Sequence, residues 1–78
     1  MDEVSEVAVR GGTIRLGQVL KLASLVENGS DVRPLLAAGA VRVDGAVETR
    51  RGAQLAVGAL VAVDGVGAAR LVAAPDED

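Results

Sequence analysis

The chain opens with an alternation of apolar and polar residues that predicts a short β-strand. Val7 and Val9, with Val4 before them, are separated by polar or small neighbours up to the pair Gly11-Gly12. Every second side chain of a strand faces the same side, whereas a glycine pair favours the backbone angles of a turn. The sequence therefore predicts a first strand that ends at the glycines and joins a sheet as an edge or partner strand.

Two segments with apolar residues at every third or fourth position follow, and this spacing predicts two helices. The first set is Leu16, Val19, Leu20, Ala23 and Val26, and the second set is Val32, Leu35, Leu36 and Ala38. We expect the first helix over residues 17–24 and the end of the second at Gly39. Because Pro34 is harmless only in a first turn, Asp31 is expected to cap the second helix in preference to Ser30.

A β-hairpin is predicted after the second helix. Asp44-Gly45 is among the strongest short-range turn signals, and an alternating segment lies on each side of it. A strict two-residue loop would set Arg42 opposite Val47 and mix charged and apolar side chains on one face. We therefore expect a bulge near Ala46 that shifts the register by one residue.

The rest of the chain predicts further strands, over residues 60–63 and 69–72. Together with the helices they indicate an α+β fold, in which two short helices pack on a small, mainly antiparallel β-sheet. Leu20 and Leu36 fall on the two apolar stripes that must be buried together. We expect both of them in one core.

Length and composition limit the domain organisation and the chemistry. With 78 residues, the chain is interpreted as one domain over residues 1–74 and an acidic, flexible tail over residues 75–78. It contains no cysteine, histidine or aromatic residue, so thiolate and imidazole ligands are absent and a nucleophilic serine lacks its usual base. We predict no catalytic residue, no metal and no cofactor.

Nothing in the sequence predicts export or insertion into a membrane. The first residues are acidic where a secretory signal would be basic and then strongly apolar. The longest uncharged stretch has 12 residues, whereas a helical membrane span takes about 20 apolar ones. We expect a cytoplasmic protein.

The charge is unevenly distributed along the chain. The net charge is −3, yet residues 10–51 carry seven bases and four acids, a local charge of +3. An anionic partner responds to charges within a Debye length of about 8 Å at physiological salt, so the local excess matters more than the total. On charge alone, an ordinary solvated surface accounts for the pattern equally well.

Three stretches taken together resemble the RNA-binding S-four domain, a family named after a protein of the small ribosomal subunit. They are Ile14-Arg15-Leu16-Gly17-Gln18-Val19-Leu20-Lys21-Leu22, Gly39-Ala40-Val41-Arg42-Val43-Asp44-Gly45 and Glu48-Thr49-Arg50-Arg51-Gly52. The resemblance covers residues 13–65 and extends to the small, free-standing bacterial subgroup similar to the YbcJ-type proteins. It implies the alpha-L RNA-binding motif, whose helix-loop-helix lies against the phosphate backbone of structured RNA.

The resemblance also implies the partners and the binding residues. It points to a monomeric, non-enzymatic module for structured RNA, ribosomal or transfer RNA, associated with the ribosome and not with a membrane. Without aromatic rings on which unpaired bases could stack, the chain is left with shape and phosphate contacts. The positions that correspond to the family's basic surface are Arg15, Lys21, Arg33, Arg42, Arg50 and Arg51. Ser30 and Asn28 are added as hydrogen-bonding candidates at the start of the second helix.

Several of these bases have a structural alternative. The alternative ion pairs are Arg15 with Glu27 and Arg42 with Glu48. The stem of Lys21 can simply cover the edge of the core. Arg50 and Arg51 cannot both pair easily with one glutamate, so we expect at least one of them to face solvent or a ligand.

The chain departs from the family pattern in ways that thin the basic surface. Ala53 and Gln54 stand where relatives are commonly basic, Asp44 stands where asparagine is usual, and Pro34 interrupts the second helix. Weak or assisted RNA binding is therefore expected. Two alternatives stay open: a protein-interaction module whose strands within residues 55–72 pair with a partner, and a fold that has lost RNA binding.

Overall fold

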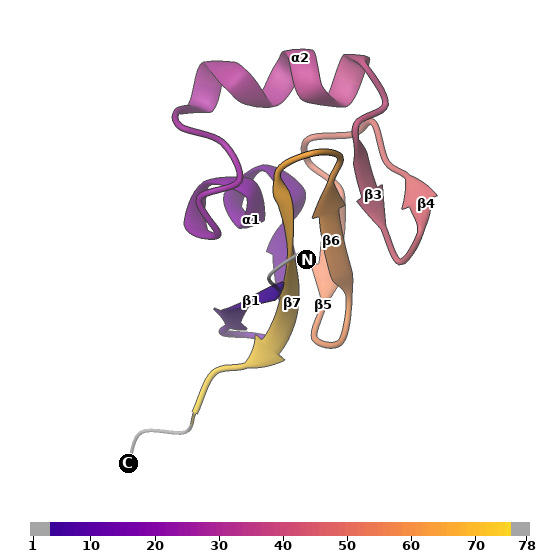
Figure 1. Ribbon diagram of the computed structural model, residues 1–78. Coiled ribbons are helices and arrows are strands. Elements are labelled where there is room, and N and C mark those ends of the chain that lie inside the picture. The colour runs from indigo at the N-terminus through magenta and orange to yellow at the C-terminus, as the bar shows by residue number, and fades with distance from the viewer. Residues whose placement is uncertain (1–3, 76–78) are drawn as a thin grey trace.

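The computed structural model describes residues 4–75, which form two helices packed against two small sheets (Figure 1). The strands are β1 (Val4–Val9), β2 (Thr13–Arg15), β3 (Val41–Val43), β4 (Ala46–Val47), β5 (Gln54–Ala56), β6 (Leu60–Val63) and β7 (Gly67–Ala73). The helices are α1 (Leu16–Leu22) and α2 (Val32–Ala37), and a 3-10 turn, η1 (Gly29–Asp31), precedes α2. Of the predicted acidic tail, residues 76–78 lie outside the described residues.

The larger sheet has five strands in the order β1-β7-β6-β3-β4. Neighbouring strands are antiparallel except for β1, which runs parallel to β7 at the edge. β2 and β5 form a separate antiparallel ladder. The predicted α+β class with a mainly antiparallel sheet is thus confirmed. The predicted first strand is also confirmed, because β1 forms one edge of this sheet. The β2–β5 ladder was not predicted, because β2 is three residues long and runs directly into α1.

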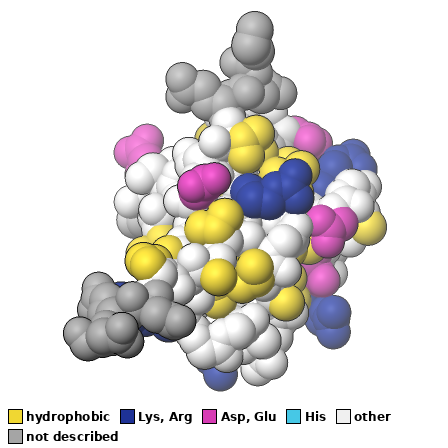
Figure 2. Space-filling model, turned by 90° about the horizontal axis from the view of Figure 1, so that it is seen from below, with side chains coloured by type: hydrophobic (Ala, Val, Ile, Leu, Met, Phe, Trp, Pro, Cys, Tyr) yellow, Lys and Arg dark blue, Asp and Glu magenta, His cyan; other side chains and the backbone are white. Residues whose placement is uncertain are grey.

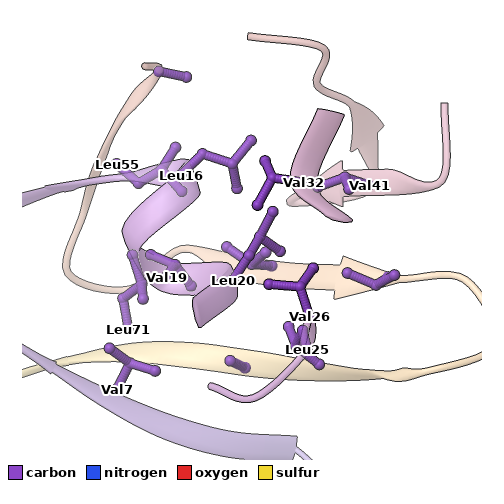
Figure 3. Packing of buried hydrophobic residues seen from close by; sticks show 14 of the residues in the cluster. Val7, Leu16, Val19, Leu20, Leu25, Val26, Val32, Val41, Leu55 and Leu71 are labelled. Carbon is purple, nitrogen blue, oxygen red and sulfur yellow. The ribbon is translucent and has the colours of Figure 1, made fainter. Parts of the chain in front are cut away.

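One hydrophobic core lies between the helices and the sheet, and α1 supplies its centre. Leu16, Val19 and Leu20 have no exposed surface, and Leu36 of α2 is 4% exposed. Figure 3 shows Leu16 next to Leu55 of β5 and Val32 of α2, and Val19 next to Leu71 of β7 and Val7 of β1. The prediction that Leu20 and Leu36 share one core is confirmed, and each such leucine contributes roughly 1.5–3 kcal/mol through burial.

The β3–β4 hairpin contradicts the predicted bulge. Arg42 lies opposite Val47, which is the register of a strict two-residue loop. Asp44 and Gly45 have φ angles of 52° and 88°, and positive φ at both central positions is the backbone of a type I′ turn. The mixed face is tolerated because β4 is a sheet edge where Val47 remains 49% exposed, so the register need not separate charged from apolar side chains.

The helix boundaries differ slightly from the predicted ones. α1 covers residues 16–22 in place of 17–24, because Ser24 has a left-handed φ of 58° that ends the helix. Asp31 precedes α2 as predicted, but its side chain makes no capping hydrogen bond. Asn28 caps the preceding turn η1 by accepting a hydrogen bond from the Ser30 backbone N–H at 3.2 Å.

The helices are short. Within residues 4–75, no helix is long and apolar enough to cross a membrane.

Candidate nucleic-acid interface

The loop between β4 and β5 is fixed to the first turn of α1 by backbone hydrogen bonds. The Leu16 N–H donates to the Ala53 carbonyl at 2.9 Å, and the Gly17 N–H donates to the Arg51 carbonyl at 3.0 Å. The first N–H groups of a helix have no partner within the helix, so these carbonyls satisfy groups that would otherwise need water or a cap. Arg51 is therefore held at the N-terminal end of α1.

The Arg51 side chain crosses α1 at Gly17 and extends toward η1. An alanine Cβ at Gly17 would lie 2.9 Å from Cγ and 3.1 Å from Nε of Arg51. A Cβ at Gly29, in η1, would lie 3.8 Å from Nη2 of the same side chain. The guanidinium therefore lies between α1 and η1, above a helix turn that presents no side chain to it.

Two clefts share Arg51 as a common wall. The first is lined by Arg15, Gly17, Gln18, Lys21, Arg51 and Gly52. The second is lined by Gly29, Ser30, Arg33, Leu36, Ala37, Thr49 and Arg51. No carboxylate lines either cleft within residues 4–75. The basic surfaces of α1 and α2 thus meet at Arg51, which comes from the loop between β4 and β5.

Four cations around these clefts, Arg15, Lys21, Arg33 and Arg51, are named here the basic cluster. Their side chains form no hydrogen bond or ion pair with any other residue of the described range 4–75. The predicted alternative pair of Arg15 with Glu27 is therefore not formed. All four side chains are on exposed residues, so their charges are available to an anionic partner.

Arg50, in contrast, is engaged with Glu48. Its Nε lies 3.2 Å from Oε2 of Glu48, and its Nη2 lies 3.4 Å from Oε1. The same Oε2 accepts hydrogen bonds from the backbone N–H groups of Thr49 and Arg50 at 3.0 and 2.9 Å. The Arg50 side-chain hydrogen bond, more than any other cause, lowers the pKa of Glu48 below its ordinary value. We expected at least one arginine of the pair to face solvent or a ligand, and Arg51 is exposed while Arg50 contacts Glu48.

Arg42 is also paired, but not with the predicted residue. Its Nε lies 3.7 Å from Oδ1 of Asp64, in the turn between β6 and β7. The expected partner, Glu48, is occupied by Arg50. Arg42 and Arg50 line neither of the two clefts.

The end of the molecule opposite α2 has a different surface. Figure 2 shows this face, on which apolar, basic and acidic side chains are interspersed. The basic groups visible there lie apart from one another or beside acidic ones. This face shows no concentration of basic side chains like the one around the two clefts.

The family model described as S4 domain matches residues 7–69. This chain belongs to the S4 domain family. S4 domains are generally RNA-binding modules and are not enzymes in general. The matched segment contains α1, α2, the hairpin and the loop with Arg51, so it includes the whole basic cluster. A search of curated proteins finds no match.

Ser30 of this S4 domain lies in the second cleft, but its hydroxyl is already used. The Ser30 Oγ donates to Oδ1 of Asn28, which also accepts from the Ser30 backbone. The helix that follows, α2, has only six residues, so its dipole adds little. A direct role of Ser30 in binding RNA stays a prediction.

Three residues that line the two clefts, Gly17, Gln18 and Thr49, were not predicted from the sequence. Gln18 lines the first cleft, and its Oε1 also accepts a hydrogen bond from the Arg15 N–H at 3.3 Å. Its spacing of three from both Arg15 and Lys21 places it on their helix face and could have revealed it. Thr49 and Gly17 carried no such signal, because their importance depends on how the loop after β4 packs on α1.

Proposed function

We propose that this S4 domain binds structured RNA, of the ribosomal or transfer type, through phosphate and shape contacts at the basic cluster. The observation that carries the proposal is the convergence of four cations on two clefts that share Arg51, with neither a pairing partner nor a lining carboxylate among residues 4–75. Each Lys or Arg that neutralises a phosphate releases condensed counterions, which supplies affinity without reading sequence. Arginine adds paired N–H donors that match phosphate geometry.

Recognition of bases is not part of the proposal. The chain has no aromatic side chain on which an unpaired base could stack. Phosphate contacts position a protein on a nucleic acid, whereas contacts with base edges specify the sequence. The proposed domain therefore responds to the folded shape of the RNA and has little sequence preference.

The cellular setting is proposed on the same basis. We place the domain among proteins similar to the YbcJ type, acting as a monomer in the cytoplasm and in association with the ribosome. The stretches around α1, the hairpin and the arginine pair support this placement. Gln54 is exposed where relatives are commonly basic, and Ala53 is buried, so the surface has fewer cations and weak binding is expected.

The test compares two double variants that remove equal charge. Arg33→Ala with Arg51→Ala removes two members of the basic cluster, and Arg42→Ala with Arg50→Ala removes two paired arginines. Binding to labelled ribosomal RNA hairpins, transfer RNA and an unstructured single strand is measured by fluorescence anisotropy, with circular dichroism as the folding control. We expect the cluster variant to lose affinity for the structured RNAs far more than the paired variant. Equal losses would contradict the proposed site.

A protein-binding function is the second candidate, and one observation favours it. β1 is an edge strand of six residues, and edge strands can pair with a strand of another protein. Of the strands within residues 55–72, β6 and β7 are already paired on both sides, whereas the three-residue β5 is paired, among the described strands, only with β2. A partner strand could therefore add to β1 or to β5, and β1 is the longer of the two. Unchanged RNA binding in both double variants would put this function ahead.

A further inference from the structure

We infer that Gly17 is a positioning residue for RNA binding, because the lack of a side chain there allows Arg51 to lie across α1 between the two clefts. The inference rests on the proposed function. It adds a residue that touches no RNA but determines where the central cation of the site lies.

The packing of Arg51 on Gly17 leaves no room for a methyl group. The atoms that an alanine Cβ would meet, at 2.9 and 3.1 Å, are Cγ and Nε, in the middle of the arginine side chain and not at its tip. The loop cannot simply lift away, because the Gly17 N–H donates to the Arg51 carbonyl at 3.0 Å. With the backbone held, the Arg51 side chain must adopt another rotamer.

Nothing in the backbone of α1 explains a glycine at this position. Gly17 lies within α1 and is not among the residues with positive φ, unlike Gly39 and Gly45. In a helix, alanine is favoured over glycine by about 1 kcal/mol. The requirement for glycine therefore comes from the side chain that passes over it.

The position of Arg51 decides whether the two clefts act together. Arg15 and Lys21 line one of the two clefts that share Arg51, and Arg33 lines the other. With Arg51 between them, the clefts form one continuous positively charged surface along which neighbouring phosphates can bind. A displaced Arg51 would leave two separate and weaker sites.

The experiment uses Gly17→Ala, Arg51→Ala and the combination of both, with Leu22→Ala as the control. Leu22 also belongs to α1, but it is 65% exposed and lines neither cleft. Affinity for a structured ribosomal RNA hairpin is measured by fluorescence anisotropy. Gly17→Ala should weaken binding several-fold, whereas Leu22→Ala should change it by less than about twofold, the error within which independent sites add. In the Arg51→Ala background, Gly17→Ala should likewise change affinity by less than about twofold.

A folding readout keeps the inference falsifiable. Should Gly17→Ala lower the melting temperature, the added Arg51→Ala should restore it, because the clash is removed; a combined variant that stays destabilised would overturn the inference. The inference would also be overturned if Gly17→Ala lowered RNA affinity equally with and without Arg51. It would be overturned as well if Gly17→Ala left RNA affinity unchanged while Arg51→Ala lowered it. Both results would leave the proposed function intact. Unchanged binding in Arg51→Ala would overturn the proposed interface and this inference together.

Discussion

The basic cluster around α1 and the arginines next to the β3–β4 hairpin differ in how far their charges are available to a partner. Arg42 lies 3.7 Å from Asp64, and Arg50 lies 3.2 Å from Glu48. The four members of the cluster have no such partner within residues 4–75. An arginine that is already paired must give up its carboxylate before it can bind a phosphate. Whether an arginine is available to a phosphate therefore depends more on its pairing with a carboxylate than on its being an arginine.

The two regions also differ in how firmly the structure holds them. α1 buries Leu16, Val19 and Leu20 completely, so the cations at its surface stand on a fixed element. β4 consists of two exposed residues at the edge of the sheet. Binding sites on packed elements are better defined than those on loose edges. The comparison predicts that stability and RNA affinity respond to different substitutions in the two regions.

The largest expected effect comes from the core under the basic cluster. Leu20→Ala should lower the free energy of unfolding by about 2–5 kcal/mol, because Leu20 is fully buried and its truncation leaves a cavity. Urea denaturation followed by circular dichroism measures it. RNA binding should be lost together with folded protein. A loss below about 1 kcal/mol would contradict the packing of α1 on the sheet.

The next effect separates the two clefts of the cluster. Lys21→Ala and Arg33→Ala should each reduce the slope of log affinity against log salt by about 0.7–0.9, because each removes one phosphate contact. The two lie in different clefts, so their effects should add. Salt titrations with a ribosomal RNA hairpin give the slopes. If only one of the two substitutions changed the slope of log affinity against log salt, the RNA interface would be restricted to one cleft.

Outside the cluster, Arg42→Ala should have little consequence. Its side chain is 44% exposed and that of Asp64 is 60% exposed, and exposed pairs contribute about 0–1 kcal/mol. Chemical denaturation should therefore show a small loss of stability, and RNA affinity should stay close to that of the wild type. A marked loss of affinity would mean that the hairpin belongs to the interface after all.

The smallest effect concerns the pH response of the Arg50–Glu48 pair. The pKa of Glu48 is lowered in the folded state, chiefly by the Arg50 side chain, so the charged carboxylate favours folding. That contribution is complete above the unfolded-state pKa, about 4.3 for glutamate, and is lost as the pH falls through the lower folded-state pKa. A carbon-detected NMR titration should place the Glu48 midpoint below the ordinary value. Arg50→Ala should raise it, and an unchanged midpoint would show that the pair is not formed in solution.

Much of the fold could be predicted from the sequence where a periodic pattern sets it. The stripe from Leu16 to Val26 predicted the helix because burial of one face sets its period, and the Asp44-Gly45 turn signal between two alternating segments predicted the hairpin. The hairpin register could not be derived in this way. β4 buries nothing, so the turn geometry at Asp44-Gly45 decided the pairing against the pattern of faces.

The sequence predicted the four cations of the basic cluster as candidates, but it did not predict how they are arranged or that Gly17, Gln18 and Thr49 line the same clefts. The sequence does not distinguish Arg50 from Arg51 as a binding candidate. The structure shows that Arg50 pairs with Glu48, whereas Arg51 lies over α1. The pairing of Arg42 with Asp64 joins residues far apart in the chain, and no local pattern indicates it. Gly17 could not be identified either, since its role depends on a side chain that arrives from another segment.

The comparison of Arg50→Ala with Arg51→Ala tests most sharply whether RNA binds at Arg51 and not at its paired neighbour. The two residues are adjacent and carry the same charge. Affinity for a ribosomal RNA hairpin is measured over a range of salt concentrations for both variants and the wild type, with thermal unfolding as the control. Arg51→Ala should weaken binding by about tenfold or more and flatten the salt dependence, as expected for loss of a charged hydrogen bond to phosphate. Arg50→Ala should bind nearly as the wild type does, because its guanidinium is engaged with Glu48. Equal effects of the two substitutions, or a larger effect of Arg50→Ala, would contradict the account.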